Sequence, residues 1–472
     1  MNYKEFVDGG CKDFAACGVY PKSVRKLGDA TIFMADRGEA DVLVSVGESG
    51  LQGKKCECCG AIVADCDHAA AEFLRANFAF TKPVPVLSYP RTIGVGDRLG
   101  IAGYGHTRVF EKYDALPILC QQSIRELNLT HRTYEDVLDA STFAVYREGF
   151  ERGFGADGDH LKSIADVEYA LGLGFTMLTL DCSEHIKGDG GSIVCPECEE
   201  RYLGKVFDVG EGVKLEFNRE ELAKIVYIYG EAIDFAVSIW DKYLADGRYK
   251  TDFEISIDET ATPTTPLQHF FVANELIRRG VKPATMAPRF CGEFQKGVDY
   301  IGDLKQFEAE MRVHAQIARF FGYKISVHSG SDKFSVFPSV GRETRGVFHV
   351  KTAGTNWLEA MKVIAEHDPA LYRDVHKFAL TAFAEASTYY HVTTDLTKVP
   401  DIDTLKDEEL PGLFKLNDAR QLIHITYGLI LSDKRFHDAL YSAWRKYAPE
   451  YADAVAAHIG RHLKELGVPE RA

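Results

Sequence analysis

The sequence predicts an α/β protein built around a (β/α)8 barrel of the TIM type, with an N-terminal cap region and a C-terminal helical extension. Three observations support this. Short apolar segments alternate with amphipathic segments between residues 84 and 357, there are eight such apolar segments, and polar side chains follow most of them. Strands that alternate with helices pair in parallel, and eight of them favour a closed barrel over an open doubly wound sheet.

The eight expected strands are short, apolar and rich in β-branched or aromatic residues. This composition is typical of strands that are covered on both faces. They are residues 84–90, 116–123, 141–150, 175–181, 253–258, 284–288, 324–329 and 347–352.

The intervals between these strands carry helix start and stop signals. Ser163 and Asn218 each precede an acidic residue three positions later and then an apolar stripe, which predicts a capped helix after each. Further helices are predicted over residues 266–279 and 304–321, because each range is followed by a glycine.

The flanking regions differ from the barrel. Residues 1–83 form the expected cap region, residues 84–357 the catalytic barrel and residues 358–472 the helical extension. Helices in the extension would complete the barrel wall or form an interface between copies in a homo-oligomer.

Composition excludes several classes of function. The chain of 472 residues has 70 acidic and 55 basic residues, a formal charge of −15, and no basic run, so nucleic acid is a poor partner. No run of about 20 apolar residues predicts a membrane span, and the N-terminus lacks a secretory signal. An odd count of 11 cysteines argues against a disulfide scaffold, so we expect a cytoplasmic protein.

Polar residues at the carboxyl ends of the expected strands are the candidates for chemistry, because barrel enzymes place their active sites there. Strand alternation points Glu254, Ser256 and Asp258 toward the barrel axis. It points Ser326 and His328 the same way. Histidine and carboxylate together are the usual ligands of Zn, Mn or a similar divalent cation.

Each of these residues also has a structural interpretation, because a single buried histidine or aspartate is more often a hydrogen-bonded core group. For Asp181, Glu184 and His349 the structural role is favoured. Function is favoured for His160, Glu254 and His328. Arg98, Arg125 and Lys333 would either hold a substrate carboxylate or form ion pairs at the barrel rim.

Two groups of cysteines admit a second metal site. Cys56, Cys58, Cys59 and Cys66 lie close in sequence, and Cys195 and Cys198 have a zinc-knuckle spacing. A structural zinc bound by Cys56, Cys59, Cys195 and Cys198 would join the cap to the loop after the fourth strand; ordinary thiols are the alternative. No dinucleotide fingerprint or phosphate loop is present, so nucleotide chemistry has no support.

Several longer segments resemble the tagaturonate epimerase family. They are FGADGDHLK (154–162), DETATPTTPLQHFFVANEL (258–276), APRFCGEFQKGVDY (287–300) and ISVHSGSDKFSVFP (325–338), with GVGDRLG (94–100) and QQSIRE (121–126) in agreement. The resemblance covers roughly residues 85–360. The cysteine-rich stretches are not part of the family pattern and leave open a divergent subfamily with another substrate.

The resemblance implies a metal-dependent interconversion of D-tagaturonate and D-fructuronate in hexuronate catabolism. Carried onto this sequence, it gives His160, Glu293 and His328 as metal ligands, Asp159 as general base, and Glu254 as general acid with Asp258 as second choice. Arg98, Ser123, Arg125 and Lys333 are the substrate-binding candidates. A retro-aldol route suits this chemistry, because the hydroxyl-bearing carbon that changes lies β to the ketone and its C–H is not acidified. The alternatives are a related fructose/tagatose 4-epimerase, an aldolase, or a sugar-binding barrel without activity.

Overall fold

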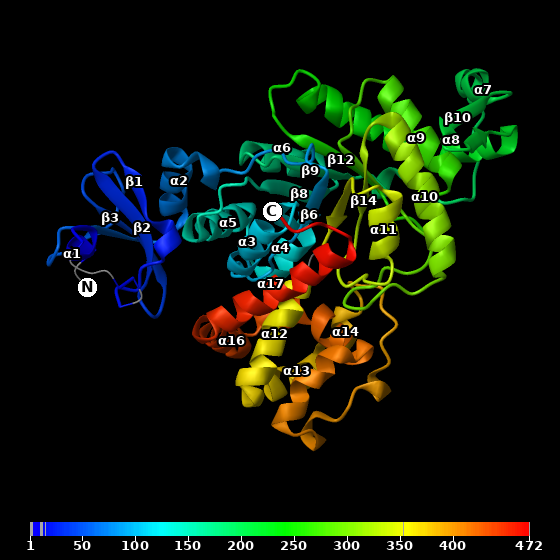
Figure 1. The fold of residues 1–472 in the computed structure, drawn as a ribbon. Coiled ribbons are helices and arrows are strands. Elements are labelled where there is room, and N and C mark those ends of the chain that lie inside the picture. The colour runs from blue at the N-terminus through cyan, green and yellow to red at the C-terminus, as the bar shows by residue number, and fades with distance from the viewer. Residues whose placement is uncertain (1–2, 10–12, 15, 353, 472) are drawn as a thin grey trace.

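The computed structural model describes residues 3–9, 13–14, 16–352 and 354–471, and its centre is a closed barrel of eight parallel strands (Figure 1). The spatial order is β12-β13-β14-β15-β6-β7-β8-β9, and pairing of β9 with β12 closes the ring. The predicted barrel fold is therefore confirmed. The strands are β6 (Arg91–Gly94), β7 (Leu116–Ser123), β8 (Gly155–Leu161), β9 (Met177–Asp181), β12 (Asp252–Ile257), β13 (Thr285–Pro288), β14 (Lys324–Val327) and β15 (Phe348–Lys351).

Two of the eight strand assignments were wrong. Residues 84–90 form no strand, and the first barrel strand is the segment directly after them. Residues 141–150 lie mostly in helix α5 (Tyr134–Glu148), which a capping box of Thr133 and Asp136 begins. The third strand is instead β8, which lies in the segment predicted to follow residues 141–150 as a loop. Its inward side chains are carboxylates and it contains two glycines, so it lacks the apolar composition of the other strands. The predicted number of eight barrel strands is nevertheless correct, because each misplaced segment lies next to a true strand.

The predicted helices between the strands are present. Helix α6 begins after the N-cap Ser163, α8 begins after the N-cap Asn218, and α10 ends at Gly322, whose left-handed φ of 83° suits glycine. The helices up to the last strand and just beyond it are α3 (Gly103–Lys112), α4 (Ile124–Thr130), α5, α6 (Ile164–Gly172), α7 (Pro196–Tyr202), α8 (Arg219–Ile239), α9 (Pro266–Arg278), α10 (Leu304–Phe321), α11 (Phe337–Glu343) and α12 (Thr355–His367). A hairpin of β10 (Val206–Gly210) and β11 (Val213–Glu216) follows α7.

The N-terminal region is an antiparallel sheet at one end of the molecule (Figure 1). Alternate residues of its strands face opposite sides. Ile32 and Met34 pack toward α2 and α5, while Phe33 and Ala35 pack toward α1. Its elements are α1 (Tyr3–Val7), β1 (Arg25–Leu27), β2 (Ala30–Asp36), β3 (Asp41–Val46), β4 (Lys54–Lys55), β5 (Ile62–Asp65) and α2 (His68–Asn77).

The C-terminal helices share one hydrophobic core with the barrel. The Trp357 indole donates to the Ile423 carbonyl at 2.8 Å, and the Trp444 indole donates to the Ala360 carbonyl at 3.0 Å, so both buried rings are satisfied. The helices are α13 (Pro369–Ala386), α14 (Asn417–Ile425), α15 (Tyr427–Ser432), α16 (Lys434–Lys446) and α17 (Ala448–Glu465), and short 3-10 turns occupy Leu396–Lys398, Ile402–Thr404 and Asp407–Lys415.

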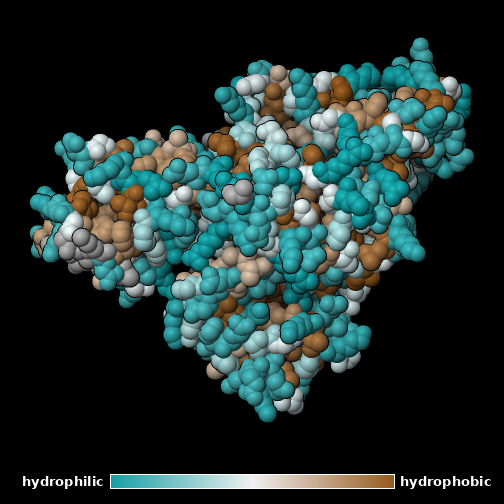
Figure 2. Space-filling model, in the orientation of Figure 1, coloured by the Kyte–Doolittle hydropathy of each residue, from teal (hydrophilic) through white to brown (hydrophobic). Residues whose placement is uncertain are grey.

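The outer surface is mainly hydrophilic in the view of Figure 2, in keeping with the net charge of −15. Among the helices that the structure describes, none is both long and apolar enough to cross a membrane.

Candidate active site

A cavity of about 610 Å³ opens at the carboxyl ends of the barrel strands. Both its size and its position are typical of a small-molecule site in a barrel. Seven of the predicted site residues line it: Ser123, Arg125, Asp159, His160, Asp258, Glu293 and His328.

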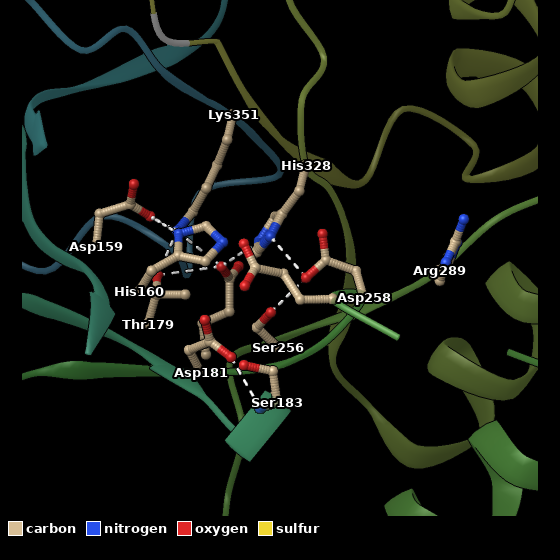
Figure 3. Close-up of polar contacts among 12 residues, drawn as sticks. Asp159, His160, Thr179, Asp181, Ser183, Ser256, Asp258, Arg289, His328 and Lys351 are labelled. Carbon is tan, nitrogen blue, oxygen red and sulfur yellow. Dashed lines mark hydrogen bonds and ion pairs between the residues drawn. The ribbon is translucent and has the colours of Figure 1, made fainter. Parts of the chain in front are cut away.

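Lys351, at the end of the last strand, is the centre of a buried charge cluster (Figure 3). Its Nζ lies 2.7 Å from Asp157 Oδ2, 2.7 Å from Asp159 Oδ1 and 2.9 Å from Glu254 Oε1, and it also donates to the Thr179 hydroxyl. Although burial lowers it, the three carboxylates raise the pKa of Lys351 well above its ordinary value. The lysine is therefore a fixed cation in the barrel interior.

The carboxylates around Lys351 differ in their access to the cavity. Asp159 lines it and also accepts from His160 Nδ1 at 2.8 Å. Glu254 does not line it. This side chain is fully buried and accepts from Thr179, Thr285 and His328 at 3.1, 2.6 and 2.7 Å. The expected general acid is thus placed behind the ring of His328.

His160, Asp258 and His328 form a group that can hold a metal ion, since each offers a ligand atom within 4.8 Å of the others. His328 Nε2 is bonded to Glu254. Its buried Nδ1 lies 3.2 Å from Asp258 Oδ1 but has no hydrogen-bond partner among the described residues. Asp159 orients the His160 ring and Glu254 orients the His328 ring, as carboxylates do in many histidine metal sites, and the second His328 nitrogen faces Asp258 Oδ1. The donor set suits zinc or a similar divalent cation.

Glu293 lies outside this group. It lines the cavity, but its side chain is 43% exposed, and its Oε2 lies 3.7 Å from His391 Nε2. Asp258 is the carboxylate that accompanies the two histidines, and it accepts a 2.5 Å hydrogen bond from the Ser256 hydroxyl. The predicted trio of His160, Glu293 and His328 is therefore not brought together.

A backbone irregularity brings two neighbouring side chains into the cavity. Residues in succession on a strand face opposite sides, yet both Asp159 and His160 line the cavity. The register between β8 and β9 shifts between Gly158 and Leu161, and His160 has a left-handed φ of 54°. Bulges of this kind re-aim side chains next to active sites, and a non-glycine residue in this conformation carries backbone strain.

Arg98 and Lys333 are absent from the described cavity lining, and both are committed elsewhere. The Arg98 guanidinium lies 2.6 Å from Glu126 Oε1 and 3.8 Å from the centre of the Tyr427 ring. Lys333 Nζ donates to the backbone carbonyls of Gln295, Val298 and Ser331 at 2.9, 2.7 and 2.9 Å. Both side chains are therefore engaged with neighbouring groups instead of the cavity.

Several lining residues were not selected from the sequence. The sequence predicts Lys351 only as part of the last strand. An inward lysine in a barrel must be paired with acidic groups, and this requirement could have identified Lys351 as a site residue. Lys296 lies within the segment 287–300 but gives no local signal. The segment Tyr389–His391 follows α13 and reaches the cavity only through tertiary packing.

The cysteine groups do not meet. Cys195 and Cys198 form a disulfide at the start of α7, at the opposite end of the molecule from the N-terminal sheet that carries Cys56 and Cys59 (Figure 1). A single zinc bound by all four residues is therefore excluded, because its ligands must surround one ion.

A cavity lined by histidines, carboxylates and a lysine at the carboxyl end of a barrel is typical of an enzyme that acts on a small polar molecule. Comparison with known proteins makes this class specific. Residues 20–466 match the family model for tagaturonate epimerase. The chain is 43% identical over 467 residues, 95% of this chain and 96% of the relative, to the tagaturonate/fructuronate epimerase of Thermotoga maritima.

Solved structures agree with this result. A glycerol-bound crystal structure of the fructuronate-tagaturonate epimerase of Cohnella laeviribosi is similar with a TM-score of 0.94 at 46% identity, covering 98% of both chains. The native crystal structure of that enzyme gives 0.93 at 45% identity, covering 99% of this chain and 100% of the other. The chain belongs to the tagaturonate epimerase family and is a carbohydrate epimerase. The resemblance inferred from the sequence is confirmed.

Proposed function

We propose that this protein interconverts D-tagaturonate and D-fructuronate by a metal-dependent retro-aldol and aldol sequence. One observation supports this most strongly. An ionised carboxylate, Asp159, and a metal-ligand group, His160, Asp258 and His328, line the same cavity. The relatives named above are epimerases of these two sugars.

Asp159 is the proposed base for the substrate hydroxyl. Although burial raises it, Lys351 and His160 hold the pKa of Asp159 well below its usual range, so the carboxylate is ready to accept a proton. Removing the hydroxyl proton lets the adjacent C–C bond break into an aldehyde and an enediolate. Rotation of the aldehyde before the bond reforms gives the epimer. His160, Asp258 and His328 would hold a divalent ion, which would supply Lewis-acid stabilisation of negative charge.

The opposite face needs a second proton-transfer group, for which we propose Asp181. It lines the cavity at the end of β9, and its buried Oδ2 has no hydrogen-bond partner among the described residues. Lys162 Nζ lies 3.3 Å from that oxygen and can offset its charge. Glu254, predicted as the acid, is better placed to orient His328 and to pair with Lys351.

Arg125 and Lys296 are the proposed carboxylate-binding pair. Both line the cavity, and among the described residues Lys296 Nζ has no hydrogen-bond partner. Burial, together with the nearby cations Arg98 and Arg125, lowers the pKa of Lys296. An incoming carboxylate would restore the charged form and supply the missing partner. This arrangement favours a uronate over a neutral ketose.

The direct test is to incubate purified protein with D-tagaturonate and added Mn²⁺ or Zn²⁺, with an EDTA-treated control, and to follow the products by NMR. Metal-dependent formation of D-fructuronate is expected, with loss of turnover in His328→Ala. Absence of conversion with every metal would exclude the proposal. Release of a trappable aldehyde without epimer would identify an aldolase instead.

Substrate choice is tested with Lys296→Met. We expect KM for D-tagaturonate to rise about 10- to 100-fold, as for loss of one charge-assisted hydrogen bond. Any turnover of D-tagatose or D-fructose is expected to change less than about 3-fold, since these lack the carboxylate. Lys296→Arg, which keeps the charge, is the matched variant and should retain most of the affinity. Equal losses on both substrates would contradict the assignment.

A further inference from the structure

Three cysteine thiols meet in the loop between β4 and β5 of the N-terminal sheet. Cys56, Cys58 and Cys59 each offer a sulfur within 4.8 Å of the others, and the Cys56 and Cys58 sulfurs are 3.1 Å apart. Cys58 is exposed and the other two are partly buried. Thiols this close together can share one ion, and the exposed Cys58 is open to oxidation when they do not.

The backbone of this loop holds the thiols together. The Cys56 N–H donates to the Ala61 carbonyl and the Gly60 N–H donates to the Cys56 carbonyl, both at 2.7 Å. Gly60 has a left-handed φ of 70°, which glycine adopts without strain. The loop is thus a closed turn whose geometry is set by hydrogen bonds independent of the sulfurs.

The chemistry of the thiols suits a soft cation. The Cys58 and Cys59 thiols lie close enough to the Cys56 sulfur for the three to share one ion. Thiolates bind zinc-class ions and are poor ligands for Mg²⁺ or Mn²⁺. The active-site group offers nitrogen and oxygen ligands and no sulfur, so a sulfur-to-metal signal distinguishes the two sites.

A fourth sulfur lies nearby. Cys17 is buried in the hydrophobic cluster of Tyr3, Phe6 and Phe33, against which Cys56 and Cys59 also pack. Structural zinc sites commonly use four such ligands in a tetrahedron.

We propose that Cys56, Cys58 and Cys59 bind a zinc-class ion, with Cys17 of the adjoining cluster as the candidate fourth ligand, and that this ion is separate from the metal proposed for the barrel. Because α1 packs on the same cluster, the ion would fasten α1 and the segment before β1 to the outer face of the N-terminal sheet. This site has a purely structural role and lies outside the barrel.

The test uses the full-length enzyme purified under reducing conditions and reloaded with Co²⁺. A sulfur-to-cobalt charge-transfer band in the near-ultraviolet is expected for the wild type. The band should disappear in Cys56→Ser/Cys59→Ser and weaken in Cys17→Ser. Cys66→Ser is the matched control, because Cys66 packs on the opposite face of the sheet, and it should keep the band.

Zinc content gives a second readout. Elemental analysis should show about one equivalent of zinc fewer per chain in the double variant than in the wild type, with epimerase turnover unchanged. If the double variant does not fold, blocking the thiols of the wild-type protein should abolish the cobalt band. No sulfur-to-cobalt band in the reduced wild type, or an unchanged zinc content in the double variant, would overturn the proposal whatever the enzyme's activity.

Discussion

Two buried lysines occupy opposite ends of the same barrel and have opposite electrostatic environments. Lys351, at the carboxyl end of β15, is surrounded by Asp157, Asp159 and Glu254 and has a pKa well above its ordinary value. Lys324, at the amino end of β14, donates to the Tyr89 carbonyl and to Thr92 Oγ1 at 2.9 and 3.0 Å. Burial lowers the pKa of Lys324 to about 7.

The contrast shows that burial alone does not decide whether a barrel lysine is charged. Burial disfavours the charged form at both ends, and only close carboxylates reverse that effect. Neutral acceptors satisfy the hydrogen bonds of Lys324 without restoring its charge. The carboxyl end of the barrel thus holds charged side chains at the candidate active site, while the groups at the amino end contribute to stability, as is general for this fold.

The largest effect is expected from removing the buried lysine at the carboxyl end of the barrel. Lys351→Met leaves three carboxylates buried without their cation, which should lower the free energy of unfolding by about 3–5 kcal/mol. Turnover should fall by roughly 10³-fold, because Asp159 loses the charge that keeps it ionised. Chemical denaturation and steady-state kinetics measure the two losses. A variant as stable as the wild type would show that Lys351 does not hold the cluster together.

The second prediction compares two of the carboxylates that pair with Lys351. Asp159→Asn should reduce kcat by about 10²- to 10⁴-fold, the usual contribution of a general base. Asp157→Asn removes the other neighbouring aspartate, which is fully buried and absent from the described cavity lining, and should reduce kcat less than about tenfold. Comparing kcat for the two variants tests the assignment. Similar losses would indicate that both act only through Lys351.

A third prediction concerns the amino end. The folded-state pKa of Lys324 is about 7, whereas an unfolded lysine has about 10.4. Between these values the unfolded chain binds a proton that the folded chain has released, so stability rises with pH. The wild type should gain on the order of 3 kcal/mol between pH 7 and 10 relative to Lys324→Met. Urea unfolding of both proteins at each pH measures this difference, in which other titrating groups cancel. A flat difference would show that Lys324 stays charged.

The smallest effect is expected from removing a negative charge near Lys324, at the amino end of the barrel. Asp252 accepts the Leu87 N–H at 2.8 Å and raises the pKa of Lys324 by its charge. Asp252→Asn keeps an acceptor for Leu87 but removes the charge, so the pKa of Lys324 should fall further. Stability should then begin to rise at a lower pH, with less than about 1 kcal/mol change at pH 8. The pH at which the urea midpoint begins to rise is the measurement, and an unchanged onset would contradict the coupling.

The sequence predicted the barrel because hydrophobic periodicity reports which segments are covered on both faces. The sequence did not predict β8. Asp157 and Asp159 lie on the inner face of this strand and pair with a buried lysine, so the segment has the polar composition of a loop. Strand alternation predicted that Asp258 and His328 point toward the barrel axis, and both line the cavity. Residues that depend on long-range packing could not be foreseen. Examples are Lys296, the Tyr389–His391 segment and the commitment of Lys333 to three backbone carbonyls.

The left-handed backbone at His160 has a consequence for how this protein can change over generations. Glycine or asparagine would suit that conformation better than histidine. Selection for heat resistance alone would therefore favour replacing a residue that we propose as a ligand of the catalytic metal. At position 160, substitutions that stabilise the fold are therefore expected to reduce turnover. Variant libraries screened only for folding should accumulate inactive proteins with changes at this position.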